Sequence, residues 1–353
     1  GILEDMPRLD WSGSCPSLLL EPSRTNLINK SEYGFIINNT SIDYNNAISP
    51  EGYQNAFKST ATSAYGVFTR VGNFVYSAPT TISVFLKRGN TDWLNIICSG
   101  NGNLFFNFNT QTGDFGSNVG SLVSNLKSED YGNGWWRVSA LFNHTGIADV
   151  RVYITSSGTT GFADGTCSIG DYFYGYGYQA EDDGAGGGSS YPTSYIPTYG
   201  VSQTRLEEKL ADSIDIGSFT STYNTLFFDW GDMDGKSTFN KEIVRGWATM
   251  DNTFPVFRIV SLTDGRLRYQ VYTSGFSESA DYTCTTRDKV AFVFNGLNSK
   301  LFINGSLVAT YSLDVTQGLR KFNYNGFSRN ITNQFIIFPT ALSDDECIAL
   351  TTI

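Results

Sequence analysis

The feature that most constrains the fold is a recurring set of short segments in which apolar and polar residues alternate. Residues 81–87 read TISVFLK, residues 135–142 read WWRVSALF, and residues 267–272 read LRYQVY. Alternation with a period of two is the pattern of a half-buried strand. Turns rich in glycine and asparagine interrupt these segments at a spacing of about 8–12 residues, which favours a sandwich or barrel. The chain is therefore predicted to be all-β.

Length and composition agree with this prediction and suggest two domains in tandem. Charged residues make up 16% and aromatic residues 15% of the 353 residues, which is typical of β-sandwiches. Domains usually contain about 100–200 residues, so two are expected. The strand pattern recurs on both sides of a segment near residues 203–211. We expect an extension from an upstream segment at 1–14, one β-sandwich at 15–205 and another at 212–353.

Two local signals refine this division. Residues 184–188 read GAGGG, which is typical of a flexible loop, but residues 191–197 contain more aromatic and proline residues than a free linker needs. We therefore expect 191–197 to pack back on the first domain, although Tyr191 and Tyr195 could instead lie between protomers. Near the end of the chain, Ser343 followed three residues later by Glu346 forms a capping box, which predicts a short C-terminal helix.

Charge and hydropathy argue against two classes of partner. The net charge is −10, and an acidic protein repels the phosphate backbone, so no nucleic-acid partner is expected. No segment approaches the roughly 20 apolar residues of a membrane span, so no membrane insertion is expected. The chain begins at Gly1, which is consistent with a fragment of a longer polypeptide.

Three separated motifs resemble those of bacteriophage virion proteins. Residues 7–27 contain PRLDWSG and CPSLLLEPSRTNL, residues 132–138 read GNGWWRV, and GYQAE at 177–181 precedes PTSYIPT at 192–198. The resemblance covers residues 5–205 and is to tail-fibre and head-fibre-like adhesion proteins. It implies a jelly roll similar to carbohydrate-binding modules. The second domain, with FINGSLV at 302–308, is similar to a laminin-G or concanavalin A-like sandwich.

The resemblance implies a function in adhesion. The expected protein is a non-enzymatic component of the virion, and therefore extracellular, that binds polysaccharide or another glycan on the bacterial surface. Its other expected partners are virion proteins and further copies of itself, because linked copies raise avidity. The resemblance to virion fibres, which are commonly three-fold, implies a trimer. One alternative is a purely structural virion protein with lectin-like folds, and another is a polysaccharide-degrading enzyme.

The sequence offers little support for the enzyme alternative. The chain has one histidine, His144, and one histidine cannot form a His-rich metal site. Glycoside hydrolysis requires two facing carboxylates, and the Glu-x-Asp-x-Glu string of concanavalin-like glucanases does not occur. Acidic residues cluster instead in expected loops and in the helix cap. The sequence alone does not exclude a catalytic pair of carboxylates contributed by two distant strands.

Candidate glycan-binding residues follow from the chemistry of sugars. A pyranose ring has an apolar C–H face that packs on an aromatic ring, and its hydroxyls need amides or carboxylates nearby. Trp93 has this neighbourhood in Asp92 and Asn95, and Trp230 and Trp247 are further candidates. Trp135 and Trp136 are adjacent, so they point to opposite faces of a strand and at least one should lie in the core.

A calcium site is a further hypothesis. Asp232 and Asp234 alternate beside Gly235, and carboxylate oxygens are the ligands that Ca²⁺ prefers. A solvated acidic turn is the simpler alternative, because the full EF-hand string is absent.

Overall fold

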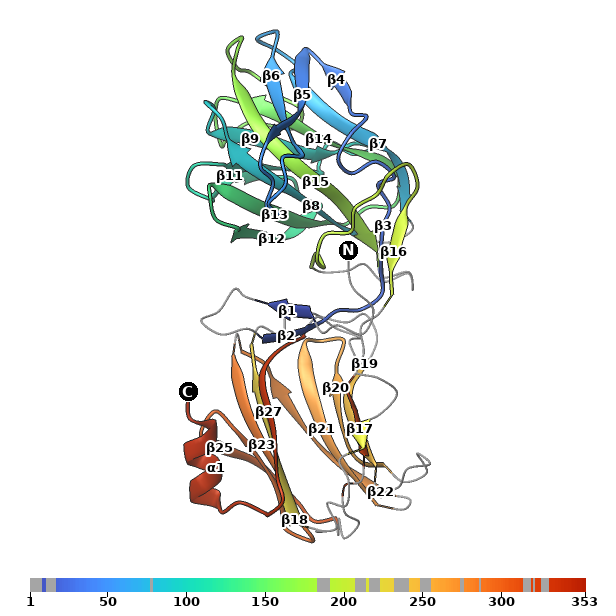
Figure 1. Ribbon diagram of the computed structural model, residues 1–353, viewed down its shortest axis with the longest axis vertical. Helices are drawn as coiled ribbons and strands as arrows, with labels where there is room; N and C mark the ends of the chain where they lie inside the picture. The colour runs from blue at the N-terminus through green and yellow to red at the C-terminus, as the bar shows by residue number, and fades with distance from the viewer. Residues whose placement is uncertain are drawn as a thin grey trace. The chain divides into compact units, whose positions relative to one another are not determined.

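The computed structural model confirms the all-β class (Figure 1). The structure describes residues 8–10, 17–76, 79–182, 191–206, 214–215, 223–231, 241–247, 255–273, 276–285, 287–313, 319, 321–324 and 330–353, and the statements below concern these residues. The chain divides into two compact units. The first unit is Arg24–Arg205, and the second unit combines Gly1–Ser23 with Leu206–Ile353.

The first unit contains two antiparallel sheets, which form the two layers of a sandwich. The six-stranded sheet has the order β11-β10-β9-β14-β7-β4. Its strands are β4 (Ile36–Asn38), β7 (Phe68–Tyr76), β9 (Trp93–Cys98), β10 (Phe105–Asn109), β11 (Phe115–Val119) and β14 (Gly146–Thr155).

The other sheet of the first unit has the order β12-β13-β8-β15-β3-β16, and β6 joins it by pairing with both β15 and β5. Its strands are β3 (Arg24–Asn26), β5 (Thr40–Ala47), β6 (Ala56–Ala61), β8 (Thr80–Arg88), β12 (Val123–Asp130), β13 (Trp135–Phe142), β15 (Tyr172–Asp182) and β16 (Gln203–Arg205).

The second unit also contains two antiparallel sheets. The seven-stranded sheet, in the order β1-β2-β27-β18-β23-β24-β25, contains β1 (Arg8–Asp10), β2 (Ser17–Leu20), β18 (Tyr223–Trp230), β23 (Asp288–Asn295), β24 (Ser299–Ile303), β25 (Ser306–Tyr311) and β27 (Asn330–Phe338). The six-stranded sheet, in the order β17-β26-β19-β20-β21-β22, contains β17 (Ile214–Asp215), β19 (Lys241–Trp247), β20 (Pro255–Ser261), β21 (Arg266–Thr273), β22 (Phe276–Thr283) and β26 (Lys321–Tyr324).

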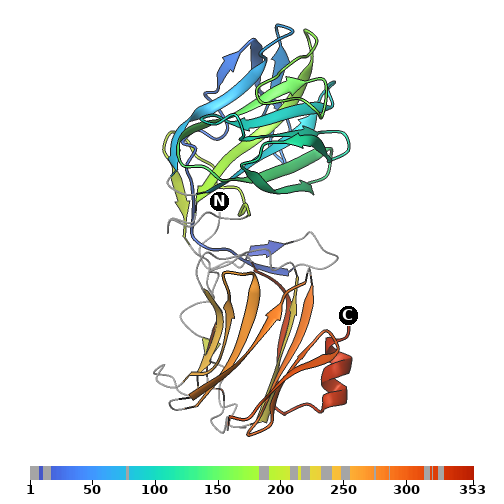
Figure 2. The ribbon, with the colours of Figure 1, turned by 180° about the vertical axis from the view of Figure 1, so that it is seen from behind.

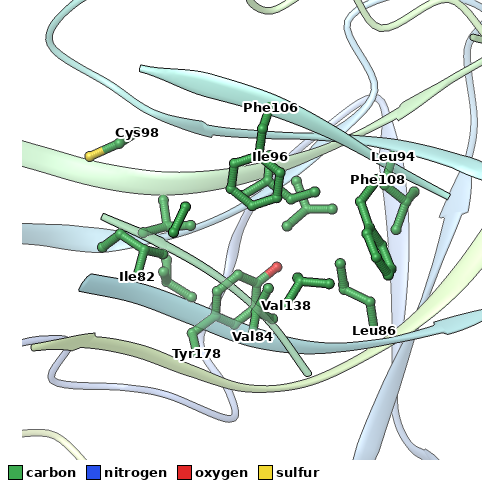
Figure 3. Packing of buried hydrophobic residues seen from close by; sticks show 14 of the residues in the cluster. Ile82, Val84, Leu86, Leu94, Ile96, Cys98, Phe106, Phe108, Val138 and Tyr178 are labelled. Carbon is green, nitrogen blue, oxygen red and sulfur yellow. The ribbon is translucent and has the colours of Figure 1, made fainter. Parts of the chain in front are cut away.

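Each unit has its own core between its two sheets. In the first unit, alternation along β8 directs Ile82, Val84 and Leu86 inward, where they meet Ile96 and Phe106 from the opposite sheet (Figure 3). The alternation that predicted the strands is therefore the same feature that fills the core. The second unit has a separate cluster of buried residues drawn from its own strands.

The segment after the glycine-rich stretch packs on the first unit, as expected from its composition. The backbone N–H of Thr193 donates to the Glu181 carboxylate at 2.9 Å. The backbone N–H of Ile196 donates to Gln179 Oε1 at 2.6 Å. Tyr191 is buried, and the Tyr195 hydroxyl lies 2.6 Å from Ser31 Oγ. Both tyrosines therefore pack on the first unit, and a contact of Tyr195 between protomers stays a prediction.

The start of the first unit differs from the expected start at residue 15. Strand β2 pairs with β27, with Leu20 opposite Asn330, and Leu20 contributes to the core of the second unit. The second unit is thus built from two separate parts of the sequence. Alternation identifies a strand but not its partner, so the sequence alone did not indicate this pairing.

The second unit ends in the predicted helix, α1 (Asp344–Thr351). The Ser343 side chain accepts from the Glu346 backbone N–H, and the Glu346 carboxylate accepts from the Ser343 backbone, which confirms the capping box. Figure 2 shows the helix on the outer side of the sheet that contains β23, where Cys347 packs with Ala291 and Phe302. Among the described residues, no helix is long and apolar enough to cross a bilayer.

Candidate ligand-binding site

Of the three site residues predicted in the first unit, one is unavailable to a ligand. Asn95 is fully buried, and its side-chain Nδ2 donates to Asn107 Oδ1 at 2.8 Å. The Asn107 Nδ2 in turn donates to the carbonyl of Thr160 at 2.9 Å, in a loop that covers this face of the six-stranded sheet. The assignment of Asn95 to glycan binding is therefore corrected, because a distant loop covers its side chain.

Trp93 and Asp92 remain accessible to solvent in part. Trp93 is half-buried, and the backbone of Gly158 lies so close that a Cβ there would be 2.4 Å from Cη2 of the indole. Asp92 Oδ1 accepts from Arg88 Nε at 2.5 Å, and about two fifths of its side chain is exposed. The two residues stay a prediction for glycan binding, with one edge of the indole already covered.

The tryptophans predicted in the second unit are both buried. Trp230 is 0% exposed, and its Nε1 donates to the hydroxyl of Tyr324 at 3.0 Å. Trp247 is 5% exposed, with the cations of Arg245 and Lys321 over its ring. Neither ring offers a free face on which a sugar could stack, so both assignments are corrected.

The proposed calcium ligands, Asp232 and Asp234, lie outside the described residues. Within the described part of the chain, no three His, Cys, Asp or Glu side chains are grouped so that they could hold a metal ion. The calcium site stays a prediction.

The structure instead draws attention to the motif at residues 132–138. Gly132, Asn133 and Gly134 have φ values of 76°, 53° and 78°, so three successive residues adopt the left-handed conformation and form the tight turn between β12 and β13. The turn delivers Trp135 and Trp136 to opposite faces of β13, as the alternation predicted. Trp135 is buried, and its Nε1 donates to the carbonyl of Ile48 at 2.9 Å.

Trp136 lies near the start of β13, next to the β12–β13 turn. Its indole is half-buried and makes an edge-to-face contact with Phe108, with 6.4 Å between ring centroids. Gly113 is needed beside it, because a Cβ at that position would lie 2.5 Å from Cη2 of the indole. The ring is thus held by the core on one side and borders a surface cleft on the other.

This cleft, which we call the Trp136 cleft, has a volume of about 260 Å³. It is lined by Lys87, Arg88, Thr110, Gln111, Asp130, Gly132, Asn133, Gly134 and Trp136. The lining residues come from the end of β8, the turn after β10, and the β12–β13 turn. Pockets for drug-sized ligands usually measure about 300–1,000 Å³, so this cleft suits a single sugar ring.

Several polar groups of the cleft already have partners, whereas two side-chain amides remain available. Asp130 Oδ1 accepts from the backbone N–H of Gly132 at 2.7 Å, and Thr110 Oγ1 donates to the carbonyl of Asp92 at 3.1 Å. The side-chain amides of Gln111 and Asn133, by contrast, form no hydrogen bond within the described part of the chain. An aromatic ring beside two available amides is the combination that sugar hydroxyls and C–H faces require.

The only histidine is not part of this cleft. His144 follows the C-terminal end of β13, whereas Trp136 is at its N-terminal end. Because a strand rises by about 3.3 Å per residue, the two ends of β13 lie roughly 20 Å apart. Sequence reasoning recognised the Trp135–Trp136 pair but did not choose Trp136, because only the three-dimensional meeting of the two turns shows that this ring borders a cleft.

Neither a family model nor a curated protein matches this chain. Among solved structures, a NanB structure is 14% identical with a TM-score of 0.32, over 40% of this chain and 26% of that chain. The CBM40 of the Ruminococcus gnavus IT-sialidase is 19% identical with a TM-score of 0.31, over 40% of this chain and 93% of that module. A leech intramolecular trans-sialidase is 16% identical with a TM-score of 0.31, over 41% and 28%. We draw no functional conclusion from similarity at this level.

Proposed function

We propose that this chain is a non-enzymatic glycan-binding protein and that the Trp136 cleft is a binding site. The observation that supports this proposal most directly is the half-buried indole of Trp136 next to the available amides of Gln111 and Asn133. The ring provides an apolar surface for a sugar face, and the amides provide both donors and acceptors for hydroxyls. No histidine lies in the cleft, and its one carboxylate, Asp130, has no facing partner among the lining residues.

We further propose that the glycan belongs to a bacterial surface and that the chain acts in a bacteriophage virion, as a fibre or decoration protein. This part of the proposal rests on the three sequence motifs between residues 7 and 198. Assembly with other virion proteins and as a trimer follows from the same resemblance. A shallow site for one sugar ring binds weakly, and several linked copies would raise the avidity by about 10²–10⁴.

Binding to an array of bacterial surface polysaccharides tests the proposed function. We expect the wild-type chain to bind, and we expect Trp136→Ala to weaken binding at least tenfold, which corresponds to about 1.4 kcal/mol. Gln111→Ala changes an exposed turn side chain at the rim and should weaken binding without affecting the fold. Trp93→Ala is the competing variant, because Trp93 is a half-buried tryptophan of the same unit that lies outside the cleft lining and is itself a predicted glycan-binding residue.

Three results would contradict the proposal. The first is absence of binding to every glycan. The second is loss of binding in Trp93→Ala with full binding in Trp136→Ala, which would place the site at Trp93. The third is release of reducing sugar from a bound polysaccharide, which would identify an enzyme.

A further inference from the structure

A polar row crosses the outer face of the six-stranded sheet in the second unit. The strand register aligns one residue from each of five neighbouring strands. In order from β26 to β22, they are Asn323, Arg245, Arg258, Gln270 and Ser279. Directly opposed residues in a sheet point to the same face. The other face of these strands is the core, because Phe257, Ile259 and Tyr269 are fully buried there.

A bulge in β19 adds a second charged residue to this face. The register shifts between Glu242 and Val244, and both Ile243 and Val244 are buried in the core. Two successive residues therefore point inward, and Glu242 and Arg245 both lie on the outer face. The two side chains form an ion pair with each other.

Arg258 is held in place without a carboxylate partner. Its Nε donates to Gln270 Oε1 at 2.6 Å, and the Tyr272 hydroxyl donates to the same oxygen at 3.2 Å. The guanidinium also lies over the ring of Tyr272, 5.3 Å from the ring centroid. A guanidinium whose Nε is held by a neutral amide still has its two terminal amino groups, which can bind an anion side by side.

Other arginines of this unit, in contrast, form ion pairs with carboxylates. Arg268 pairs with Asp281 at 2.7 Å, Arg266 pairs with Asp264 at 2.7 Å, and Arg287 pairs with Asp229 at 2.7 Å. Within the described residues, no ion pair joins Arg258 to a carboxylate. The nearby Glu242 forms its ion pair with Arg245 and interacts with Arg258 only through its charge.

The face therefore has a local excess of positive charge in a chain whose net charge is −10. Two cations, Arg245 and Arg258, lie over the rings of Trp247 and Tyr272, and Glu242 pairs with Arg245. Ser279 is exposed at the end of the row, and its hydroxyl can hydrogen-bond a ligand.

We propose that this outer face, from β19 to β22, is a second binding site, and that its ligand is a glycan bearing carboxylate groups. The fork of Arg258 suits a carboxylate, and hydroxyl and amide groups alongside suit the remaining atoms of an acidic sugar. Single-stranded DNA carries repeated negative charge without carboxylates, so it serves as the competing anion in the test. The site lies in the second unit and is independent of the Trp136 cleft.

The experiment uses the full chain and polygalacturonate as the probe, with binding measured by affinity electrophoresis and calorimetry. The matched ligand control is the same polymer with its carboxylates methyl-esterified. We expect polygalacturonate to bind and the ester to bind at least tenfold more weakly. Arg258→Gln should weaken binding at least tenfold. Arg266→Gln is the matched control, because it removes one positive charge from the same sheet. Arg266 already pairs with Asp264, so this variant should change binding less than twofold.

The outcomes distinguish this site from the cleft and from other ligands. Trp136→Ala should bind polygalacturonate as tightly as the wild type, whether or not the proposed function of the cleft holds. Arg258→Lys keeps the charge but loses the fork, so it should bind less tightly, and it replaces Arg258→Gln if that variant does not fold. Equal binding of the methyl ester, an equal loss in Arg266→Gln, or tighter binding of single-stranded DNA than of polygalacturonate would overturn the proposal.

Discussion

At the residue scale, one carboxylate of the first unit lies within hydrogen-bond distance of three tyrosine hydroxyls. Glu32 Oε1 lies 3.0 Å from the hydroxyl of Tyr195, 3.3 Å from that of Tyr176 and 3.4 Å from that of Tyr199. Burial raises the pKa of Glu32, the hydrogen bond from Tyr195 opposes this effect, and the charge of Glu51 adds to it. The cluster joins segments that are more than 140 residues apart in the sequence.

The raised pKa gives Glu32 a definite effect on stability. Because the folded state favours the protonated carboxyl, its contribution is present below the ordinary pKa and is lost as the pH rises through the folded pKa. Glu32→Gln imitates the protonated form, so the variant should melt at a higher temperature than the wild type at pH 7. The difference should shrink at pH 4, and a thermal unfolding series across this range measures it. A constant difference at both pH values would contradict the assignment.

Trp230 offers a second test at this scale. Trp230→Phe removes the hydrogen bond from Nε1 to Tyr324 and leaves unfilled volume in the core of the second unit. We expect a loss of about 1–3 kcal/mol in the free energy of unfolding. Glycan binding should not change, because the ring has no exposed face. Weaker binding at unchanged stability would return Trp230 to the list of ligand-binding residues.

At the element scale, strand β15 shows how one irregularity redistributes its side chains. Tyr174, Tyr176 and Tyr178 alternate, and a regular strand would point them all to one face. The register shifts between Tyr176 and Gln179, and Gly177 has a φ of 61°. Tyr176 consequently packs with Phe85 and Trp135, whereas Tyr178 enters the main core on the opposite face.

Gly177→Ala tests the importance of this bulge. The alanine would have to adopt the left-handed backbone conformation of Gly177. Its Cβ would lie 3.1 Å from both Phe85 Cδ2 and Tyr195 Cε2. We expect a cost of about 1–3 kcal/mol in denaturant unfolding. Gly170→Ala is the control, because Gly170 also has a positive φ but a Cβ there meets nothing within 4 Å. If both variants lose the same stability, the contacts with Phe85 and Tyr195 are unimportant.

At the scale of the whole molecule, the second unit depends on strands that precede the first unit in the sequence. Leu20 is buried in its core, and β2 supplies an antiparallel neighbour to β27. Without β2, the edge of β27 would expose unpaired backbone groups. The chain between these two parts folds into the first unit.

Deleting residues 1–23 should therefore destabilise the second unit, although the deletion lies next to the first unit in the sequence. Loss of buried leucine alone is expected to cost about 1.5–3 kcal/mol. Hydrogen exchange followed by peptide should show faster exchange in 330–338 and unchanged protection in 135–142. Leu20→Ala in the intact chain is the milder control. Faster exchange confined to residues 24–205 would contradict the division into units.

The sequence by itself determined the features that depend on neighbouring residues. Alternation along β8 and β13 indicated strands and their faces, and the opposite placement of Trp135 and Trp136 follows from a period of two. The capping box of α1 involves residues three apart. These features are visible in the sequence because the interacting groups lie within one element or one turn.

Only the tertiary structure decided which side chains are covered and which surfaces meet. The loop containing Thr160 buries Asn95, and the Tyr324 hydroxyl accepts a hydrogen bond from the indole N–H of Trp230. Two turns from different sheets meet at Trp136. The pairing of β2 with β27 crosses more than 300 residues. A period of two specifies that a strand has two faces, but the free energy of packing against distant segments decides which partner covers each face.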